Sequence, residues 1–455
     1  MTVIRADHAL LPSGWARDVS VEIGKDGRIA DVAQGGAPSS AQNVDVLLPA
    51  PANAHSHAFQ RAMAGLSEAR GAQGRDSFWT WRQLMYRFLD RLDPDQVEAI
   101  AAFVQMEMLE AGYATNVEFH YLHHRPDGHP YDRLAEMGER IAAAAATTGA
   151  GLTLLPVHYQ FGGCDGRPLG AGQRRFGNDA DRFARLVDAC RAALAALPSD
   201  AGLGVAPHSL RAVAPEALHA AAGLAGGGPV HMHLAEQQAE VEEVQAAHGR
   251  RPVEWLLDNV AVTPRWCLIH CTQMTPHETR GLAATGAVAG LCPITESNLG
   301  DGIFDGARWF DAGGAVAVGS DSNVRISLTE ELRTLEYSQR LGDRARAVLA
   351  TPETSTGRRI YEAVCTGGAQ AAGRDSGRIA QGAWADLVAL DAGHPDMAGL
   401  AGDAILDTHI FAGDDRAVRD VWAAGRHVVV HGRHTRRDEI TAAYARAVAD
   451  LREAL

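Results

Sequence analysis

The sequence contains almost no lysine. Lys25 is the only lysine in 455 residues, and every other basic side chain is an arginine or a histidine. The excess of alanine and glycine points to a bias in coding composition as the cause. The consequence for function holds in any case, because the middle of the chain offers no lysine amine for covalent catalysis or for bridging two metal ions.

Paired cysteines and membrane-spanning runs are also missing. The six cysteines are scattered without any C-x-x-C pair, which argues against a disulfide framework and against a thiolate zinc site. Residues 1–18 lack a basic start followed by an apolar core, and no apolar stretch approaches the ~20 residues of a membrane helix. We therefore expect a cytoplasmic enzyme with reduced thiols and no membrane partner.

The chain has no excess of positive charge. Its 42 lysine and arginine residues against 56 aspartates and glutamates give a formal net charge of −14. Such a chain repels phosphate backbones, so we expect no nucleic-acid partner. A small anionic substrate stays open, because a pair of arginines can dominate the charge inside one pocket.

Both ends of the chain contain short strand patterns. The segment "VSVEIGKDGRIADVA" predicts two strands joined by a Lys-Asp-Gly turn, and "VRDVWAAGRHVVVHGR" predicts strands broken by a glycine turn. A different pattern separates these two ends. We therefore predict one small β-sandwich domain built from both termini, residues 1–49 plus 378–455.

The middle of the chain repeats a strand followed by a helix. Eight short apolar runs, from "VDVLLPAPANAHSHA" to "AVAVGSDSN", end in polar residues, and alanine-rich helical stretches separate them. This alternation predicts an α/β fold, a (β/α)8 TIM-type barrel over residues 50–377, with its active site at the carboxyl ends of the strands. The most loop-like stretch, residues 164–179, is a candidate cover for that site.

Four of the apolar runs end in residues that bind metals. His55 and His57 lie two positions apart in a predicted strand, so both face one side and can share a cation. The runs "VHMHLAE", "CLIHC" and "VGSDSN" add His233, His270 and Asp321. Because the carboxyl ends of barrel strands open on one face, these side chains converge. Imidazoles with one carboxylate suit zinc, with iron or another divalent ion as the alternative, and the missing lysine favours a single metal.

The step "HLAE" places a carboxylate beside the predicted metal. If His233 binds the metal, Glu236 lies one short turn beyond it, close to the water without being a ligand. A metal lowers the pKa of water from about 15.7 toward ~7, and a neighbouring carboxylic acid can protonate the nitrogen of an attacked C=N bond. His231 is a competing ligand, but packing or support is its favoured role, because His233 has the better placed Glu236.

These motifs together resemble the amidohydrolase superfamily, whose deaminase branch uses one metal. Longer segments, "HSHAFQRAMAGL", "FWTWRQLMYRF", "EFHYLHH" and "EELRTLEYSQRL", are similar to signature segments of the formimidoylglutamate deiminases. The resemblance implies metal-dependent hydrolysis of N-formimino-L-glutamate to N-formyl-L-glutamate and ammonia in histidine degradation.

The resemblance also implies roles for individual residues. It gives one divalent metal, zinc as the first choice, with the ligands His55, His57, His233 and Asp321. It gives as catalytic residues Glu236, His270 and Asp321. It gives as substrate-binding residues Gln60, Arg82, Tyr121, His208 and Arg211. The chain departs from the family pattern after the metal aspartate, where "SDSH" is expected and "SDSNVR" stands, so Asn323 and Arg325 leave the details of that loop open.

The residues favour a dicarboxylate substrate independently. Arginine suits carboxylates through its paired donors. Arg211 follows a predicted strand in "PHSLRAV", and Arg82 lies in an aromatic stretch that is suited to close over the site. The alternative is that Arg82 and Arg211 are ordinary surface arginines without a role in substrate binding.

Two other functions remain open at this point. The first is another deaminase of the same superfamily that acts on a purine or related base, whose pocket must match a planar ring rather than two carboxylates. The second is a non-enzyme, a barrel kept as an assembly module, against which the retained ligand set argues. The resemblance further implies a homodimer.

Overall fold

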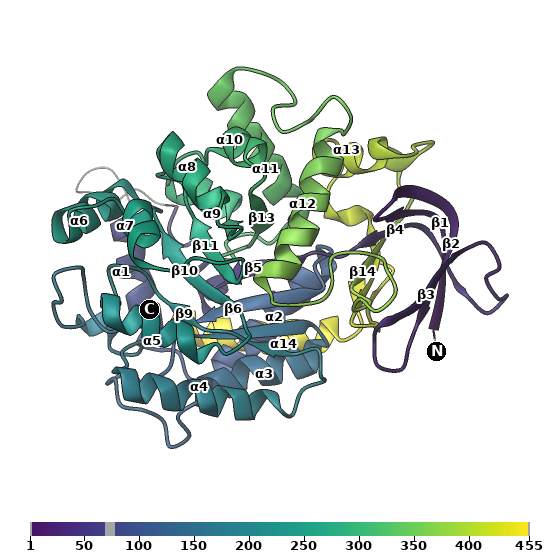
Figure 1. Cartoon of the computed structure of the whole chain (residues 1–455). Coiled ribbons are helices and arrows are strands. Elements are labelled where there is room, and N and C mark those ends of the chain that lie inside the picture. The colour runs from purple at the N-terminus through teal and green to yellow at the C-terminus, as the bar shows by residue number, and fades with distance from the viewer. Residues whose placement is uncertain (1, 69–77, 454–455) are drawn as a thin grey trace.

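The computed structural model describes residues 2–68 and 78–453. Strands and helices alternate through the larger part of the molecule, and a smaller sheet lies at one side of it (Figure 1). The strands are β1 (Thr2–Leu11), β2 (Gly14–Ile23), β3 (Ile29–Gln34), β4 (Gln42–Pro49), β5 (Ala52–Ser56), β6 (Thr115–His120), β7 (Gly151–His158), β8 (Gly202–Leu203), β9 (Ala206–Pro207), β10 (Val230–Leu234), β11 (Trp266–His270), β12 (Val288–Leu291), β13 (Ala315–Val318), β14 (Leu387–Leu390), β15 (Val418–Ala423), β16 (Arg426–Val430) and β17 (Arg433–His434).

The helices come mostly between and after the parallel strands. They are α1 (Phe78–Leu89), α2 (Pro94–Glu110), α3 (Glu136–Thr148), α4 (Ala180–Leu194), α5 (Pro215–Leu224), α6 (Gln238–His248), α7 (Pro252–Asn259), α8 (Pro276–Ala283), α9 (Pro293–Leu299), α10 (Gly306–Asp311), α11 (Leu328–Asp343), α12 (Thr356–Ala371), α13 (Asp403–Phe411) and α14 (Arg437–Glu453). Within the described residues, every helix is too short or too polar to cross a bilayer.

The middle of the chain forms two parallel sheets. One has the order β5-β6-β7-β8, with β9 also paired to β7, and the other has the order β10-β11-β12-β13. Isolated parallel bridges join Ser56 to Asp321 and Val205 to Val230, and so link the two sheets at their edges. The fold is therefore mixed α/β with parallel strands, and each of the eight predicted runs contains at least one of these strands.

Burial on both faces explains the apolar runs. Every residue of β6 and of β7 is buried, which is typical of parallel strands covered on both sides. Helix α12 approaches closely enough that a Cβ on Gly367 would lie 2.0 Å from the carbonyl oxygen of Val316 in β13. Glycine is therefore required there, and the close approach holds α12 against the strand that precedes Asp321.

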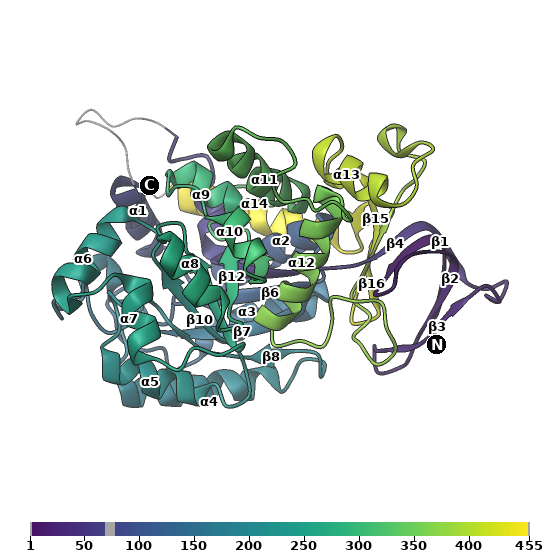
Figure 2. The same ribbon diagram turned by 45° about the horizontal axis from the view of Figure 1, so that its top comes forward.

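The strands from the two ends of the chain share one sheet. Its order is β17-β16-β15-β14-β4-β1-β2-β3, so strands from the start and the end meet where β4 pairs antiparallel with β14. Figure 2 shows this sheet beside the larger part of the molecule. Since the hydrogen bonds join all eight strands in one sheet, a sandwich of two layers stays a prediction, as do the domain boundaries at residues 49 and 378.

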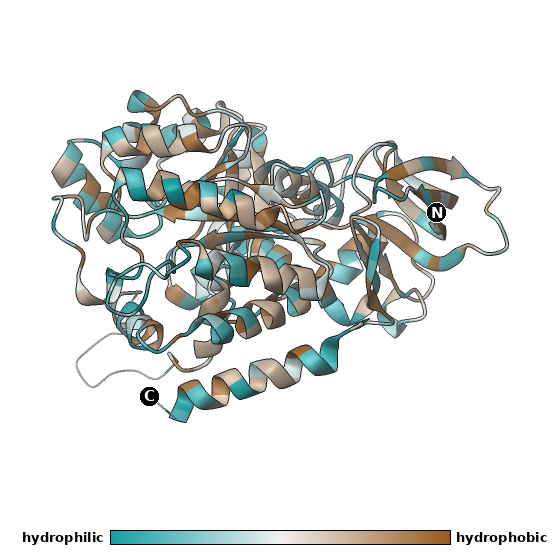
Figure 3. Ribbon diagram, turned by 90° about the horizontal axis from the view of Figure 1, so that it is seen from below, coloured by the Kyte–Doolittle hydropathy of each residue, from teal (hydrophilic) through white to brown (hydrophobic). Residues whose placement is uncertain are grey.

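The last helix returns from the small sheet to the larger part of the molecule. Figure 3 shows α14 running along the underside. Its Tyr444 ring stacks on Phe103 of α2, with 3.9 Å between the ring centroids. The end of the chain therefore contributes to both parts.

A buried ion-pair network connects the small sheet to the parallel strands. Arg374 is 3% exposed at its side chain, and its Nη2 lies 3.0 Å from Asp200 while its Nε lies 2.6 Å from Asp386. Arg426 of β16 also contacts Asp200 at 2.7 Å. Burial alone would raise the pKa of Asp200, but the two arginines hold it below its usual range. Removing one cation would leave buried carboxylates without compensation.

We expect Arg374→Ala to lower the free energy of unfolding by about 3–5 kcal/mol, because a buried ion pair broken on one side leaves an unpaired charge. Urea denaturation followed by circular dichroism measures this. Arg378→Ala is the matched control, since Arg378 pairs with Asp375 at the surface, where a pair contributes only about 0–1 kcal/mol. Equal losses in the two variants would contradict the account.

Candidate metal centre and active site

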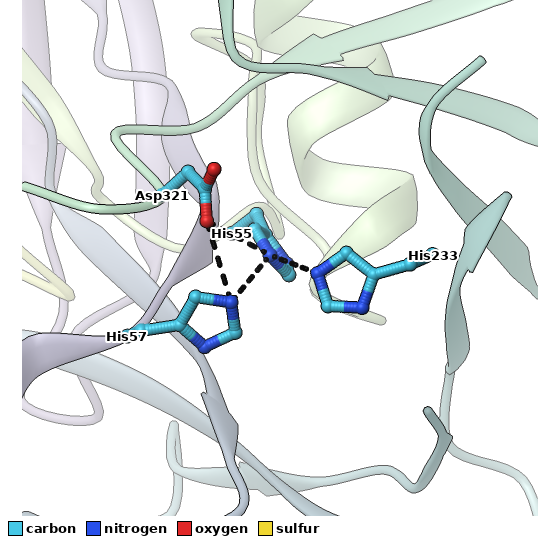
Figure 4. A group of neighbouring side chains, drawn as sticks. All are labelled: His55, His57, His233 and Asp321. Atoms are coloured by element: carbon cyan, nitrogen blue, oxygen red, sulfur yellow. Dashed lines mark hydrogen bonds and ion pairs between the residues drawn. The ribbon is translucent and has the colours of Figure 1, made fainter. Parts of the chain in front are cut away.

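Four side chains from three distant segments meet in the middle of the parallel strands (Figure 4). The Nε2 atom of His55 lies 3.2 Å from Nε2 of His57 and 3.1 Å from Nε2 of His233. Asp321 Oδ1 lies 3.4 Å from Nε2 of His55 and 3.3 Å from Nε2 of His57. Ligands held at 2.0–2.2 Å around a tetrahedral zinc ion are about 3.3–3.5 Å apart, so the spacing fits such an ion.

Hydrogen bonds of Nδ1 in His57 and His233 determine which ring nitrogen faces the candidate metal centre. Nδ1 of His57 lies 3.0 Å from the carbonyl oxygen of Phe119, and Nδ1 of His233 lies 3.3 Å from that of His208. A carbonyl oxygen only accepts, so each Nδ1 carries the hydrogen and each Nε2 turns a lone pair inward. These lone pairs and the carboxylate oxygen repel one another unless a cation lies between them, and the donor set therefore fits a divalent metal.

The protonation of the ring nitrogens agrees with this arrangement. Burial lowers the pKa of His55 to about 3, although Asp321 acts in the opposite direction. Burial also lowers the pKa of His57 and of His233. Burial alone would raise the pKa of Asp321, but the hydrogen bond and charge of His55 and the charge of His270 hold it below its usual range. Neutral imidazoles and an ionised carboxylate are the forms that bind metals.

Asn323 holds the loop that carries Asp321. Its Nδ2 donates to Ser56 Oγ at 3.2 Å and to the carbonyl oxygen of Asp321 at 3.1 Å, and its Oδ1 accepts from Ser320 Oγ at 2.6 Å. Asp321 and Asn323 both have positive φ angles, of 45° and 53°, which are uncommon for residues other than glycine. The asparagine that departs from the family pattern thus ties the strained loop to the strand of His55 and His57.

Glu236 and His270 lie beside this centre. Glu236 Oε1 is 3.7 Å from His270 Nε2, whose distance to Asp321 Oδ2 is 3.9 Å. Nδ1 of His270 lies 3.2 Å from Glu296 Oε1. Burial raises the pKa of Glu236. Burial alone would lower the pKa of His270, but the charge of Glu236 and the hydrogen bond to Glu296 raise it well above its usual value. The pair can therefore hold a proton near the reacting atoms.

Two further glutamates position these groups, and the sequence analysis missed both. The buried carboxylate of Glu240 accepts from the backbone N–H of Ala235 at 3.2 Å and of Glu236 at 2.9 Å, and so fixes the turn after β10. Glu296 accepts from the backbone N–H of Cys292 at 2.8 Å while it faces His270. Each is an acidic residue in the first turn of a helix that follows a parallel strand, which is the signal that could have found them.

A single pocket brings together the predicted substrate and catalytic residues. Of the predicted residues, those that line it are His57, Gln60, Arg82, Tyr121, His208, Arg211, His233, Glu236, His270 and Asp321. His55 is fully buried behind this wall. Gln60 Nε2 donates to the hydroxyl of Tyr121 at 2.8 Å. The wall also contains residues that were not predicted, namely Trp81, Met85, Tyr159, Phe176 and Leu299.

His231 points away from the pocket. Its Nε2 lies 2.8 Å from the carbonyl oxygen of Ala371 in α12. His231 and His233 lie two residues apart on β10, so their side chains project from the same face of the strand, but His231 lies nearer the start of the strand and outside the pocket lining. The ring of His231 therefore supports the packing of α12 at the other end of the strand.

Models of known protein families match this chain over most of its length. A family model described as "Amidohydrolase family" matches residues 46–428. The chain belongs to the amidohydrolase family. A model described as "Formimidoylglutamate deiminase HutF, N-terminal domain" matches residues 1–44. The family predicted from the strand-end motifs is thus confirmed.

Relatives of this amidohydrolase cover most or nearly all of its length. A formimidoylglutamate deiminase from Pseudomonas aeruginosa is 49% identical over 99% of the chain and 100% of that protein. A 5'-deoxyadenosine deaminase from Methanothermobacter thermautotrophicus is 26% identical over 85% of the chain and 84% of that protein. A crystal structure of an amidohydrolase from Brucella melitensis matches with a TM-score of 0.95 at 49% identity, over 99% of the chain and 100% of that structure.

We expect His233→Ala to weaken zinc binding by more than about 100-fold. The loss of a group that only hydrogen-bonds to a metal ligand already lowers metal affinity by about 10- to 100-fold, and His233→Ala removes a ligand itself. Metal content after dialysis and a zinc titration against a competing chelator measure the loss. His231→Ala is the matched control on the same strand and should keep its metal. Equal metal content in both variants would show that His233 is not a metal ligand.

Proposed function

We infer that this amidohydrolase hydrolyses N-formimino-L-glutamate to N-formyl-L-glutamate and ammonia, a step of histidine degradation. The observation that carries the assignment is the full-length similarity, at 49% identity, to the formimidoylglutamate deiminase of Pseudomonas aeruginosa. The matching N-terminal family model supports the same activity.

The pocket suits a substrate with two carboxylates. Arg82 and Arg211 both line it. Burial alone would lower the pKa of Arg211, but the carboxylates of Glu240 and Glu236 raise it, so the guanidinium stays charged. Burial and the two arginines lower the pKa of His208 well below its usual value, which makes that ring a neutral hydrogen-bonding group. If the two guanidinium groups bind the carboxylates of the substrate, they would hold its formimino carbon beside the candidate metal centre.

We propose that His55, His57, His233 and Asp321 hold one divalent metal, and that the metal is zinc. When bound, such an ion lowers the pKa of water toward ~7 and makes hydroxide available at neutral pH. The donor set supports zinc, since three imidazole nitrogens and one carboxylate are ligands that zinc prefers.

The remaining residues move protons and hold charge. Addition of water to the formimino carbon forms a new C–O bond, and the bond to the terminal nitrogen then breaks. The nitrogen leaves as ammonia after it has received both protons of the added water, and Glu236 takes these protons from the oxygen and passes them to the nitrogen. Burial raises the pKa of Glu236, which suits it to carry a proton in this transfer. His270, flanked by Glu236 and Glu296, stabilises the charge that develops on oxygen.

Three broader features belong to the same proposal. The bridges at both sheet edges support closure of the eight strands into a (β/α)8 barrel, and the terminal strands would form a β-sandwich beside it. The six cysteines are all free, which supports a cytoplasmic location. A homodimer is the assembly that the family resemblance favours.

The direct test is ammonia release by the purified zinc enzyme from N-formimino-L-glutamate, compared with guanine and 5'-deoxyadenosine. We expect turnover of the first compound only. Ammonia from a purine and none from the formimino compound would replace the assignment by a base deaminase. Zinc-loaded protein inactive on all three would favour a non-catalytic role.

We expect Arg211→Ala to lower kcat/KM for N-formimino-L-glutamate by at least about 100-fold while the metal stays bound. The variant lacks the guanidinium, so a carboxylate of the substrate would be left without a charged partner in the pocket. Steady-state kinetics with metal analysis measures this. Arg182→Ala, on the exposed part of α4, is the matched control. An unchanged kcat/KM would remove Arg211 from the substrate site.

A further inference from the structure

Tyr159 lies in the wall of the pocket without an assigned role. It directly follows β7, is 3% exposed and lines the pocket together with Arg82 and Arg211. Its ring centroid is 4.5 Å from that of His208, which in turn is 4.9 Å from that of His233. One imidazole ring therefore separates Tyr159 from the candidate metal centre.

The hydroxyl of Tyr159 receives two hydrogen bonds. Arg82 Nη2 donates to it at 3.0 Å and Gln173 Nε2 donates to it at 2.9 Å. Guanidinium and amide N–H groups only donate, so the phenol oxygen accepts in both bonds and its own hydrogen remains to be placed. Among residues 2–68 and 78–453, the bonds of this hydroxyl are these two, and the hydrogen is left to a group inside the pocket.

A second hydrogen bond fixes the side chain of Gln173 in the orientation that lets its Nε2 donate to Tyr159. Its Oε1 accepts from the backbone N–H of Gly170 at 2.9 Å, which directs the Nε2 group to Tyr159. The surrounding segment, residues 164–179, is the one predicted as a cover, and the structure anchors it at the buried Arg175. That guanidinium donates to the carbonyl oxygens of His124 at 2.7 Å and of Leu92 at 2.9 Å. The amide of Gln173 therefore has a rigid support.

We propose that Tyr159 is a further substrate-binding residue, whose hydroxyl donates a hydrogen bond to a carboxylate of the substrate. This inference rests on the proposed function. A carboxylate beside Arg82 and Arg211 is an acceptor only, and it matches a phenol that has a single hydrogen to give. Gln173 acts as a positioning residue, because its amide occupies one lone pair of the oxygen and directs the hydrogen into the pocket.

Tyr159→Phe removes only this hydroxyl. We expect kcat/KM for N-formimino-L-glutamate to fall by about 10- to 100-fold, mostly through KM, as for a hydrogen bond to a charged group. The comparison uses two shortened substrates, N-formimino-4-aminobutyrate without the α-carboxylate and N-formimino-2-aminobutyrate without the side-chain carboxylate. The ratio of wild type to variant should approach one for the compound that lacks the bound carboxylate. A ratio that is the same for all three compounds overturns the proposal.

Gln173→Glu tests the orientation of the hydrogen. A carboxylate at this position accepts from the Tyr159 hydroxyl and turns its hydrogen away from the pocket. We expect the same dependence on substrate as in Tyr159→Phe, and no further loss when the two changes are combined. Additive losses in the double variant would overturn the role of Gln173. Tyr337→Phe, which removes an exposed phenol hydroxyl outside the pocket, is the matched control.

The wild-type enzyme separates the two claims. If it releases no ammonia from N-formimino-L-glutamate, the proposed function and the inference about Tyr159 both fail. If the wild type turns over this substrate and Tyr159→Phe has the same kcat/KM, only the inference fails.

Discussion

The Nε2 atoms of three imidazole rings and one carboxylate oxygen converge on one point between the parallel strands, and the structure around them holds them there. The carbonyl oxygens of Phe119 and His208 accept the hydrogens of two rings, so the opposite nitrogens have none to offer. Such a set is stable only around a cation. Backbone strain at Asp321 and the hydrogen bonds of Asn323 are means by which the fold maintains this geometry.

The parallel strands explain how distant segments supply one site. Strands β5, β10 and β11 and the turn after β13 all end on the same face, so each places its last polar side chain next to the others. The helices that follow contribute the groups that position the chemistry, Glu240 from α6 and Glu296 from α9. The candidate metal ligands and the residues beside them thus come from several segments that lie far apart in the sequence.

The sequence predicted the periodic and strand-end features of this arrangement. His55 and His57 share a face because side chains of a strand alternate, and this could be read directly from their spacing. The roles of Glu240 and Glu296 could not, since an acidic residue early in a helix is also typical of an ordinary helix start. The anchoring of residues 164–179 by Arg175 depends on carbonyl groups far away in the chain, and no local pattern records it. Likewise, strand patterns at the two ends predicted β structure but not how those strands would pair.

X-ray absorption at the zinc edge of the purified enzyme tests the central claim most directly. The account predicts a first shell of nitrogen and oxygen atoms only, at about 2.0–2.2 Å, with the multiple scattering of imidazole rings. A sulfur neighbour near 2.3 Å would contradict it, because it would place the ion at the nearby donor group that contains a thiol, His270, Cys292 and Glu296.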